Sequence, residues 1–243
     1  MKLPHTKIRT IAWVLLCLAS FRASAQWQHL KYLPYLQGAN LKLKSPVLSY
    51  RYVVTLVDKD NRSALDSIGG VLIKSYGNYM DSNTNGISLV SDGYYMKAQK
   101  NNKTAVVYNI AAIQKKLGMK SEDMGNDLVT IPDSLLNQFS DLRVQELPSV
   151  LVLTYTMKRE AGILEEIEFS INRKDMSLLG LKLSFDELDR WGSSTGYSKI
   201  YYLYNFSNRI EPGAIELERF LSIKEGKVKL KGSFGSYSLN TLL

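Results

Sequence analysis

The chain has 243 residues, and its 31 Lys and Arg against 23 Asp and Glu give a formal net charge of +8. No cluster of Lys and Arg forms the basic footprint that phosphate groups need, so nucleic acid is excluded as a partner. One cysteine and two histidines are too few for a disulfide framework or a histidine-rich zinc site.

Residues 1–25 have the pattern of a cleavable secretory signal. A basic start precedes an apolar run from Ile11 to Leu18, and Ala23-Ser24-Ala25 forms a small-x-small cleavage site. The apolar run is shorter than the about 20 residues that a membrane-spanning helix requires. We therefore predict export to the periplasm, with no integral membrane span and with Gln26 as the first mature residue.

Cleavage removes Cys17, so the mature chain has no thiol. Lipidation of Cys17 is the alternative, but Val14-Leu15-Leu16 lacks the small residues normally found before a lipidated cysteine. The mature chain keeps one histidine, His29, which we expect at the surface of an N-terminal arm (residues 26–45). A Ser-His-Asp triad or a Cys-His pair cannot be built conventionally from this one histidine in the N-terminal arm.

Period-2 alternation dominates residues 46–243, which are predicted to form one domain. From Ile163 to Arg173 the odd positions are mostly apolar and the even positions mostly polar, which is typical of a strand with one wet face. A turn at residues 172–176 and a second alternating run over Leu179–Phe185 predict a hairpin. In chain order, the other predicted strands are Leu48–Val57, Val71–Tyr76, Ile87–Ser91, Tyr94–Gln99, Thr104–Tyr108, Val150–Lys158, Lys199–Phe206, Ile215–Lys224 and Lys227–Lys231.

Helical patterns are few. Ile110, Ile113 and Leu117 lie on one helical face before Gly118. Asp133 can cap a second helix that carries Leu135, Leu136 and Phe139, and a short third helical turn is predicted at Asp186–Trp191. The predicted fold class is mainly β: an antiparallel, strongly curved sheet that forms an incomplete β-barrel, with two or three short helices covering its concave face.

The most specific stretch lies between residues 70 and 110. A glycine-led strand, Gly70–Lys74, is followed by Leu89-Val90-Ser91-Asp92-Gly93-Tyr94-Tyr95 and then by Thr104–Ile110. This order resembles the LolA family of periplasmic lipoprotein carriers, with Gly70, Ser91, Asp92 and Gly93 as the structural motif. Residues 151–154, 164–172 and 179–183 are similar to the family's back strands.

The resemblance implies an open barrel whose concave apolar face accepts acyl chains, with no cofactor. Ser75 and Tyr76 stand where the family has an arginine and a proline, and that arginine is tied to opening of its lid. The family's gating is therefore not expected here. The tail beyond Phe220 is an addition to the family pattern.

A dry face that carries lipid needs large, deformable apolar side chains, and Met and Tyr adapt to varied ligand shapes. The same side chains can equally fill a closed core. The candidate ligand-binding residues are Leu72, Tyr76, Tyr79, Met80, Leu89, Tyr95, Phe169 and Ile171.

Carboxylates are the remaining candidates for catalysis. Glu166 and Glu168 share the polar face of one predicted strand, and Asp186 begins an acidic turn. Both groups have the simpler reading of solvated surface, so we predict no catalytic residue and no enzyme. Asp58, Asp60 and Asn61 lack the glycine and distal glutamate of a calcium loop, so no metal site is predicted.

Lys227, Lys229 and Lys231 alternate along a late strand. They either protect a sheet edge from pairing with another chain or bind headgroups or a partner.

Two functions remain open. The first is a periplasmic carrier or sensor that binds lipidated protein or another lipid-like ligand in the concave face. The alternative is a non-enzymatic interaction module of a cell-envelope assembly, with the same fold and a filled cavity. A carboxylate-dependent hydrolase of polysaccharide is a third and weaker reading.

Overall fold

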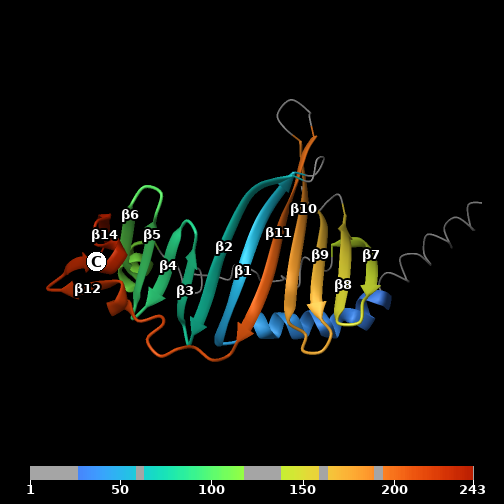
Figure 1. Ribbon diagram of the computed structural model, residues 1–243, viewed down its shortest axis with the longest axis horizontal. Helices are drawn as coiled ribbons and strands as arrows, with labels where there is room; N and C mark the ends of the chain where they lie inside the picture. Colours follow the sequence, from blue (N-terminus) through green and yellow to red (C-terminus); the bar gives the residue numbers. More distant parts are fainter. Residues whose placement is uncertain (1–26, 59–62, 118–137, 159–163, 189–193, 243) are drawn as a thin grey trace, which may run out of the picture. The chain divides into compact units, whose positions relative to one another are not determined.

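The computed structural model describes residues 27–58, 63–117, 138–158, 164–188 and 194–242 (Figure 1). Most of these residues are in strands, as the alternation predicted. Twelve strands hydrogen-bond in one sheet, in the order β14-β6-β5-β4-β3-β2-β1-β11-β10-β9-β8-β7, and β12 pairs with β13 separately. The two end strands, β14 and β7, are not paired with each other, so the sheet is open. The predicted class, a mainly β and mostly antiparallel incomplete barrel, is confirmed.

Hairpins join most sequence neighbours. The strands are β1 (Val47–Asp58), β2 (Ala64–Ser75), β3 (Asn78–Asn83), β4 (Gly86–Ser91), β5 (Tyr94–Gln99), β6 (Thr104–Asn109), β7 (Phe139–Glu146), β8 (Val150–Met157), β9 (Leu164–Asn172), β10 (Leu178–Leu188), β11 (Ser194–Ser207), β12 (Leu221–Lys224), β13 (Lys227–Leu230) and β14 (Ser238–Leu242). Strand β14 pairs with β6 in parallel. The α-helices among the described residues are residues 27–43, called here the N-terminal helix, and α2 (Ile110–Leu117). Neither is long and apolar enough to cross a bilayer.

The chain divides into two compact units. Unit 1 comprises residues 1–41, 58–62 and 131–199, and unit 2 comprises residues 42–57, 63–130 and 200–243.

The core of unit 1 lies on one face of β7 to β10. Leu153, Tyr155 and Phe169 are at most 1% exposed, and the pairings Leu153↔Phe169 and Tyr155↔Ile167 put these side chains on the same face. The N-terminal helix contributes Tyr32, Leu36 and Ala39 to the buried set. These positions recur at i, i+4 and i+7, which makes one helical face apolar.

The core of unit 2 lies on one face of β4 to β6. Successive strands place their alternate residues on this face, and a C-terminal segment covers them. The sheet supplies Ile87, Leu89, Met96, Ala98, Ala105 and Val107, and the segment supplies Ala214, Ile215, Leu217, Leu221 and Leu230. The tail beyond Phe220, which departs from the family pattern, is therefore part of this core.

A bulge in β10 changes the predicted alternation. The register shifts between Leu178 and Gly180, so that Leu178 and Leu181 are buried and Leu179 is not. The predicted set of odd positions is wrong at its first residue, because a bulge adds a residue to one strand and reverses the facing beyond it.

The other differences concern element type. Residues 217–219 form a 3-10 turn, so the predicted strand Ile215–Lys224 holds only from Leu221 onward. Phe139 begins β7 and does not end a helix, and Asp186 continues β10 to Leu188. Strands β3, β7 and β14 were not predicted. The predictions for the signal segment 1–25, for Gly118, Asp133, Leu135 and Leu136, and for Asp60, Asn61 and Trp191 lie outside the described residues.

Candidate functional site

The predicted ligand-binding residues of unit 2 lie on two opposite faces of its sheet. Tyr79 and Met80 are neighbours in β3, and successive residues of a strand point to opposite faces. Met80 pairs with Leu89, and both belong to the face that the C-terminal segment covers. Leu89 is 0% exposed, so on this face the predicted residues are packed against the chain itself.

The opposite face carries a line of residues that lie directly across from one another. The pairings are Tyr79↔Val90, Val90↔Tyr95 and Tyr95↔Tyr108. We call these four residues the aromatic row. Because paired residues have Cβ atoms about 4.5–5.5 Å apart, the row forms one strip across β3 to β6. All four side chains are half-buried.

The rings of Tyr95 and Tyr108 stack, with their centroids 6.2 Å apart and their planes 8° from parallel. Burial raises the pKa of the Tyr95 phenol, so its hydroxyl is neutral at physiological pH. The row therefore presents flat, uncharged surface that can lie against an aliphatic chain.

Lysines lie on the same face as the row. Lys74 pairs with Tyr79 at the β2 end, and its Nζ donates to the Leu43 carbonyl oxygen at 3.1 Å. Lys97 is exposed and follows Tyr95 by two residues, so it lies on the same face in the next line of pairs. An apolar strip with an exposed cation beside it suits an amphiphile with an anionic head.

The predicted residue Leu72 lies on this face as well and is 0% exposed. It pairs with Asp81, which belongs to a buried polar cluster. The Tyr52 hydroxyl donates to Asp81 Oδ1 at 2.5 Å, and the Asn83 amide donates to Asp81 Oδ2 at 3.3 Å. Burial raises the pKa of the Asp81 carboxyl, against the smaller lowering effect of these hydrogen bonds. Burial likewise raises the pKa of Tyr52.

The motif residues play structural parts. Gly70 leaves room for the Tyr52 ring, because a Cβ at this position would lie 2.6 Å from the Tyr52 Cζ. Asp92 and Gly93 have φ angles of 52° and 77° between the paired residues Ser91 and Tyr94. Two positive φ angles at the centre of a two-residue hairpin define a type I′ turn, for which Asp-Gly is a preferred pair. The predicted turn is therefore present.

The remaining predicted lining residues lie elsewhere. Phe169 and Ile171 are in the filled core of unit 1, with 1% and 0% exposure. Tyr76 is 81% exposed, with a φ of 45°, in the turn between β2 and β3. The structure thus brings together Leu72, Tyr79 and Tyr95 from the predicted set.

Sequence reasoning missed Val90, Tyr108 and Lys97 as members of this face. Each lies in a predicted strand, so the alternation gave their facing within that strand. Their side-by-side placement comes from the pairing of β4, β5 and β6, and only Tyr79 of the row lies in β3, which was not predicted.

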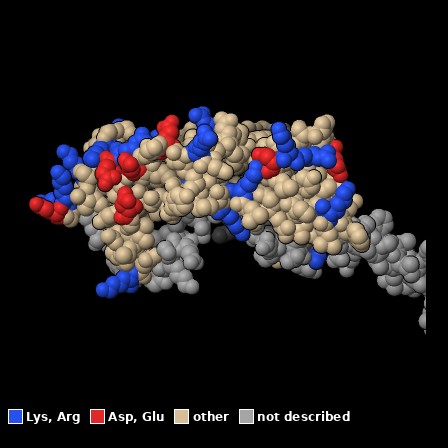
Figure 2. Space-filling model, turned by 90° about the horizontal axis from the view of Figure 1, so that it is seen from below, with Lys and Arg blue, Asp and Glu red and all other residues tan. Residues whose placement is uncertain are grey.

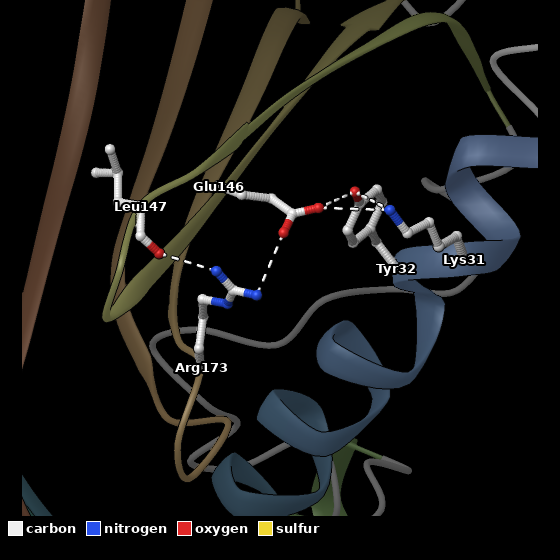
Figure 3. Close-up of polar contacts among 5 residues, drawn as sticks. All are labelled: Lys31, Tyr32, Glu146, Leu147 and Arg173. Carbon is white, nitrogen blue, oxygen red and sulfur yellow. Dashed lines mark hydrogen bonds and ion pairs between the residues drawn. The ribbon is translucent and has the colours of Figure 1, made fainter.

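Within unit 1, a second polar cluster joins the N-terminal helix to the strands (Figure 3). Glu146 accepts from the Tyr32 hydroxyl, and its carboxylate also pairs with Lys31 Nζ at 3.4 Å and with Arg173 at 3.2 Å. The Tyr32 hydrogen bond, followed by that from Lys31, lowers the pKa of Glu146.

His29 is half-buried and does not lie free at the surface as expected. Its Nδ1 is 3.0 Å from the Tyr155 hydroxyl, and its ring contacts Phe139 at a centroid distance of 5.2 Å. Burial lowers the pKa of His29. The imidazole therefore belongs to the packing between the N-terminal helix and the sheet.

The candidate catalytic carboxylates are engaged in surface contacts. Glu166 pairs with Arg143, and Glu168 Oε2 lies 3.5 Å from the Thr154 hydroxyl. Within the described part of the chain, no group of three His, Cys, Asp or Glu residues could hold a metal ion.

Comparison with known proteins gives remote structural likeness. No family model and no curated protein matches the chain. Among solved structures, the chain is similar to lipoprotein LppX of Mycobacterium tuberculosis, with a TM-score of 0.40 and 11% identity over 75% of this chain and 98% of that one. A LolA superfamily protein of Nitrosomonas europaea gives a TM-score of 0.30 and 11% identity over 74% of this chain and 94% of that one.

The Pseudomonas aeruginosa MucA/MucB complex also matches, with a TM-score of 0.38 and 11% identity over 72% of this chain and 56% of that one. The solved structures that the chain is remotely similar to thus include LolA-like proteins. Likeness at this level carries no residue role and no activity across to this chain.

Proposed function

We propose that this protein is an exported, non-enzymatic carrier or sensor that binds a lipid-like ligand on the aromatic row of unit 2. The single observation that carries the proposal is the row itself: Tyr79, Val90, Tyr95 and Tyr108 lie in register on one face and are only half-buried. The faces on the other side of the unit 2 sheet and in unit 1 are packed by the chain's own segments.

The chemistry of the row favours an amphiphile. Each buried methylene contributes about 0.8 kcal/mol, so an acyl chain gains affinity in proportion to the length that lies on the row. Lys97 supplies a cation within reach of an anionic head. We infer a ligand with one or more acyl chains and a negative headgroup, such as a phospholipid or a lipidated protein.

The first experiment looks for the natural ligand. The protein is purified from the compartment to which it is exported and measured by native mass spectrometry. We expect a bound acyl-containing mass that denaturation releases. Protein without any such mass, which after delipidation also fails to bind fluorescently labelled palmitate, would contradict the proposal.

The second experiment locates the site. Val90→Lys places a charge in the middle of the row and should weaken binding of labelled palmitate at least about tenfold. Val152→Lys is the matched control, because Val152 is also a half-buried strand valine but pairs with Gln145 and Ser170. Equal loss in the two variants would place the ligand elsewhere.

The alternative function is an interaction module of the cell envelope. One observation favours it: Leu89, Phe169 and Ile171 are at most 1% exposed, so much of the predicted lining is already filled. Crosslinking in cells that captures one stoichiometric protein partner, in protein that carries no lipid, would support this reading over the carrier.

A further inference from the structure

The N-terminal helix is apolar on two opposite faces. One face packs into the protein through Tyr32, Leu36 and Ala39. On the opposite face, Trp27, Leu30 and Leu41 are 76%, 62% and 71% exposed. With about 100° between successive residues, these three lie within about 60° of one another around the helix. We call Trp27, Leu30 and Leu41 the outer stripe.

A packed helix of a globular protein normally turns charged and polar residues toward solvent. Here three large apolar residues take that place over a helix of 17 described residues. Single exposed apolar residues need no explanation, but an aligned set of them marks an interaction surface.

The charged residues of the helix itself are all basic, although the Glu146 carboxylate of β7 pairs with one of them, Lys31. Residues 27–44 contain Lys31, Lys42 and Lys44 and no Asp or Glu. Lys31 and Lys44 are exposed. Figure 2 shows the molecule from below, where blue Lys and Arg side chains are scattered over a mostly tan surface and red Asp and Glu side chains lie beside some of them. The stripe therefore complements a surface that carries negative charge on the outside and has an apolar layer beneath it.

A lipid bilayer with anionic headgroups is such a surface. Helices that lie in the bilayer interface combine Trp and Leu on one side with Lys at its margins. The indole ring has an apolar body and a polar N–H, which suits the headgroup region. Lysine stems can lie along the apolar region while the ammonium groups reach phosphate oxygens.

The helix is held in place before any docking. Glu146 binds Tyr32 and Lys31, and Tyr155 binds His29. Gly38 packs so closely on the hairpin between β9 and β10 that a Cβ there would lie 2.9 Å from the Met176 Cβ. A helix that is already folded and fixed pays no ordering cost when it docks.

We propose that the outer stripe of the N-terminal helix docks this protein onto an anionic membrane surface. Trp27, Leu30 and Leu41 enter the interface, and the exposed Lys44 at the end of the helix contacts headgroup phosphates. This surface is distinct from the aromatic row and does not depend on ligand binding there.

The test uses the mature full-length chain and vesicles of phosphatidylcholine, with and without phosphatidylglycerol. The wild type should sediment with vesicles that contain phosphatidylglycerol and should dissociate as salt is raised. In a Trp191→Phe background Trp27 is the only tryptophan of the mature chain, and its emission should shift to the blue on binding.

Leu41→Glu should weaken this binding at least tenfold. Leu65→Glu is the matched control, because Leu65 is also an exposed leucine, at 56%, but lies in β2. Val90→Lys should keep vesicle binding while it loses palmitate, which separates this proposal from the proposed ligand site.

Three results would overturn the proposal. They are a wild type that stays in the supernatant with anionic vesicles at low salt, equal binding to pure phosphatidylcholine, and equal loss in Leu41→Glu and Leu65→Glu. If the wild type ignores both vesicle types but crosslinks through position 30 to a protein in cells, the outer stripe binds protein instead.

Discussion

Tyr52 has its place in the sheet because Gly70, directly across from it, has no side chain. The phenol is 3% exposed, and an added Cβ at Gly70 would lie 2.6 Å from its Cζ and hydroxyl. We predict that Gly70→Ala lowers the free energy of unfolding by about 1–3 kcal/mol, because overpacking a buried site displaces the ring and its hydrogen bond to Asp81. Urea denaturation measures this loss.

Gly69 provides the control for that substitution. It lies in the same strand, but its nearest neighbours would be 3.9 Å from an added Cβ. Gly69→Ala should therefore change the stability little. Similar losses at both positions would show that strand conformation, and not the Tyr52 ring, is responsible.

Asp81 makes the stability of the protein depend on pH. Its pKa is raised in the folded state, chiefly by burial. At pH values between the unfolded pKa and the folded pKa, the folded chain therefore binds more protons than the unfolded chain. Its contribution to stability is therefore complete below the unfolded pKa of about 3.9. It is lost as the pH rises toward the higher folded pKa.

We predict that Asp81→Asn, which cannot titrate, gains stability relative to the wild type as the pH rises from about 4. Urea unfolding at a series of pH values measures the difference. Asp66→Asn, at an exposed position, controls for the loss of a negative charge. A difference between wild type and Asp81→Asn that does not change with pH would count against the assignment.

Single residues show where local sequence is sufficient. Asp92-Gly93 specifies its turn through the φ angles that these two residues tolerate, so the turn was predictable from two letters. The facing of Leu178 was not predictable, because the bulge after it depends on pairing with β9. The burial of His29 was missed for a similar reason, since its partner Tyr155 is 126 residues away.

At the scale of elements, the N-terminal helix is stabilised by its inner face. Leu36 is 2% exposed, whereas Leu41 on the outer stripe is 71% exposed. We predict that Leu36→Ala lowers the free energy of unfolding by about 2–5 kcal/mol, because it removes buried methyl groups and leaves a cavity. Leu41→Ala should cost less than about 0.5 kcal/mol.

Thermal or urea denaturation of the two variants makes this comparison within one helix. Loss of stability in Leu41→Ala equal to that in Leu36→Ala would mean that the outer stripe is packed in solution. That result would also weaken the docking proposal, which requires the outer stripe to be accessible.

The helix was expected only as an arm, although its signal was present. Tyr32, Leu36, Ala39 and Leu43 follow helical spacing, but Pro34 and Gly38 interrupt it with residues that disfavour helix interiors. Strand β3 was missed because Asn78–Asn83 is mostly polar, and its buried Asp81 accepts a hydrogen bond from Tyr52 of another strand. Local patterns cannot indicate a polar residue that is buried by a distant hydrogen bond.

At the scale of the molecule, the open, mostly antiparallel sheet followed from the alternation, whereas the placement of the candidate site did not. The alternation gives two faces for each strand but does not say what covers either face. Leu89 and Tyr95 were grouped as one lining, yet the C-terminal segment covers the first and leaves the second half-buried. That difference depends on contacts between residues more than a hundred positions apart.

The C-terminal segment should therefore be indispensable to unit 2. In a chain that ends at residue 208, the face that holds Leu89, Met96 and Val107 loses its cover. Ile215, Leu217, Leu221 and Leu230 are each at most 6% exposed. Burial of each side chain contributes about 1.5 kcal/mol or more, so removing all four lowers the free energy of unfolding by about 6 kcal/mol. Folded domains have a free energy of unfolding of only about 5–15 kcal/mol. We therefore predict that the chain ending at residue 208 binds the dye ANS and aggregates.

A chain that ends at residue 236 is the control, because it lacks β14 and keeps all four of these residues. It should remain folded, with a smaller loss of stability from the unpaired edge of β6. Dye binding and light scattering compare the two chains directly. If the chain ending at residue 208 stays monomeric and binds no dye, this face does not need its cover. Leu89 and Met80 would then return as candidates for ligand contact, beside the row on the opposite face.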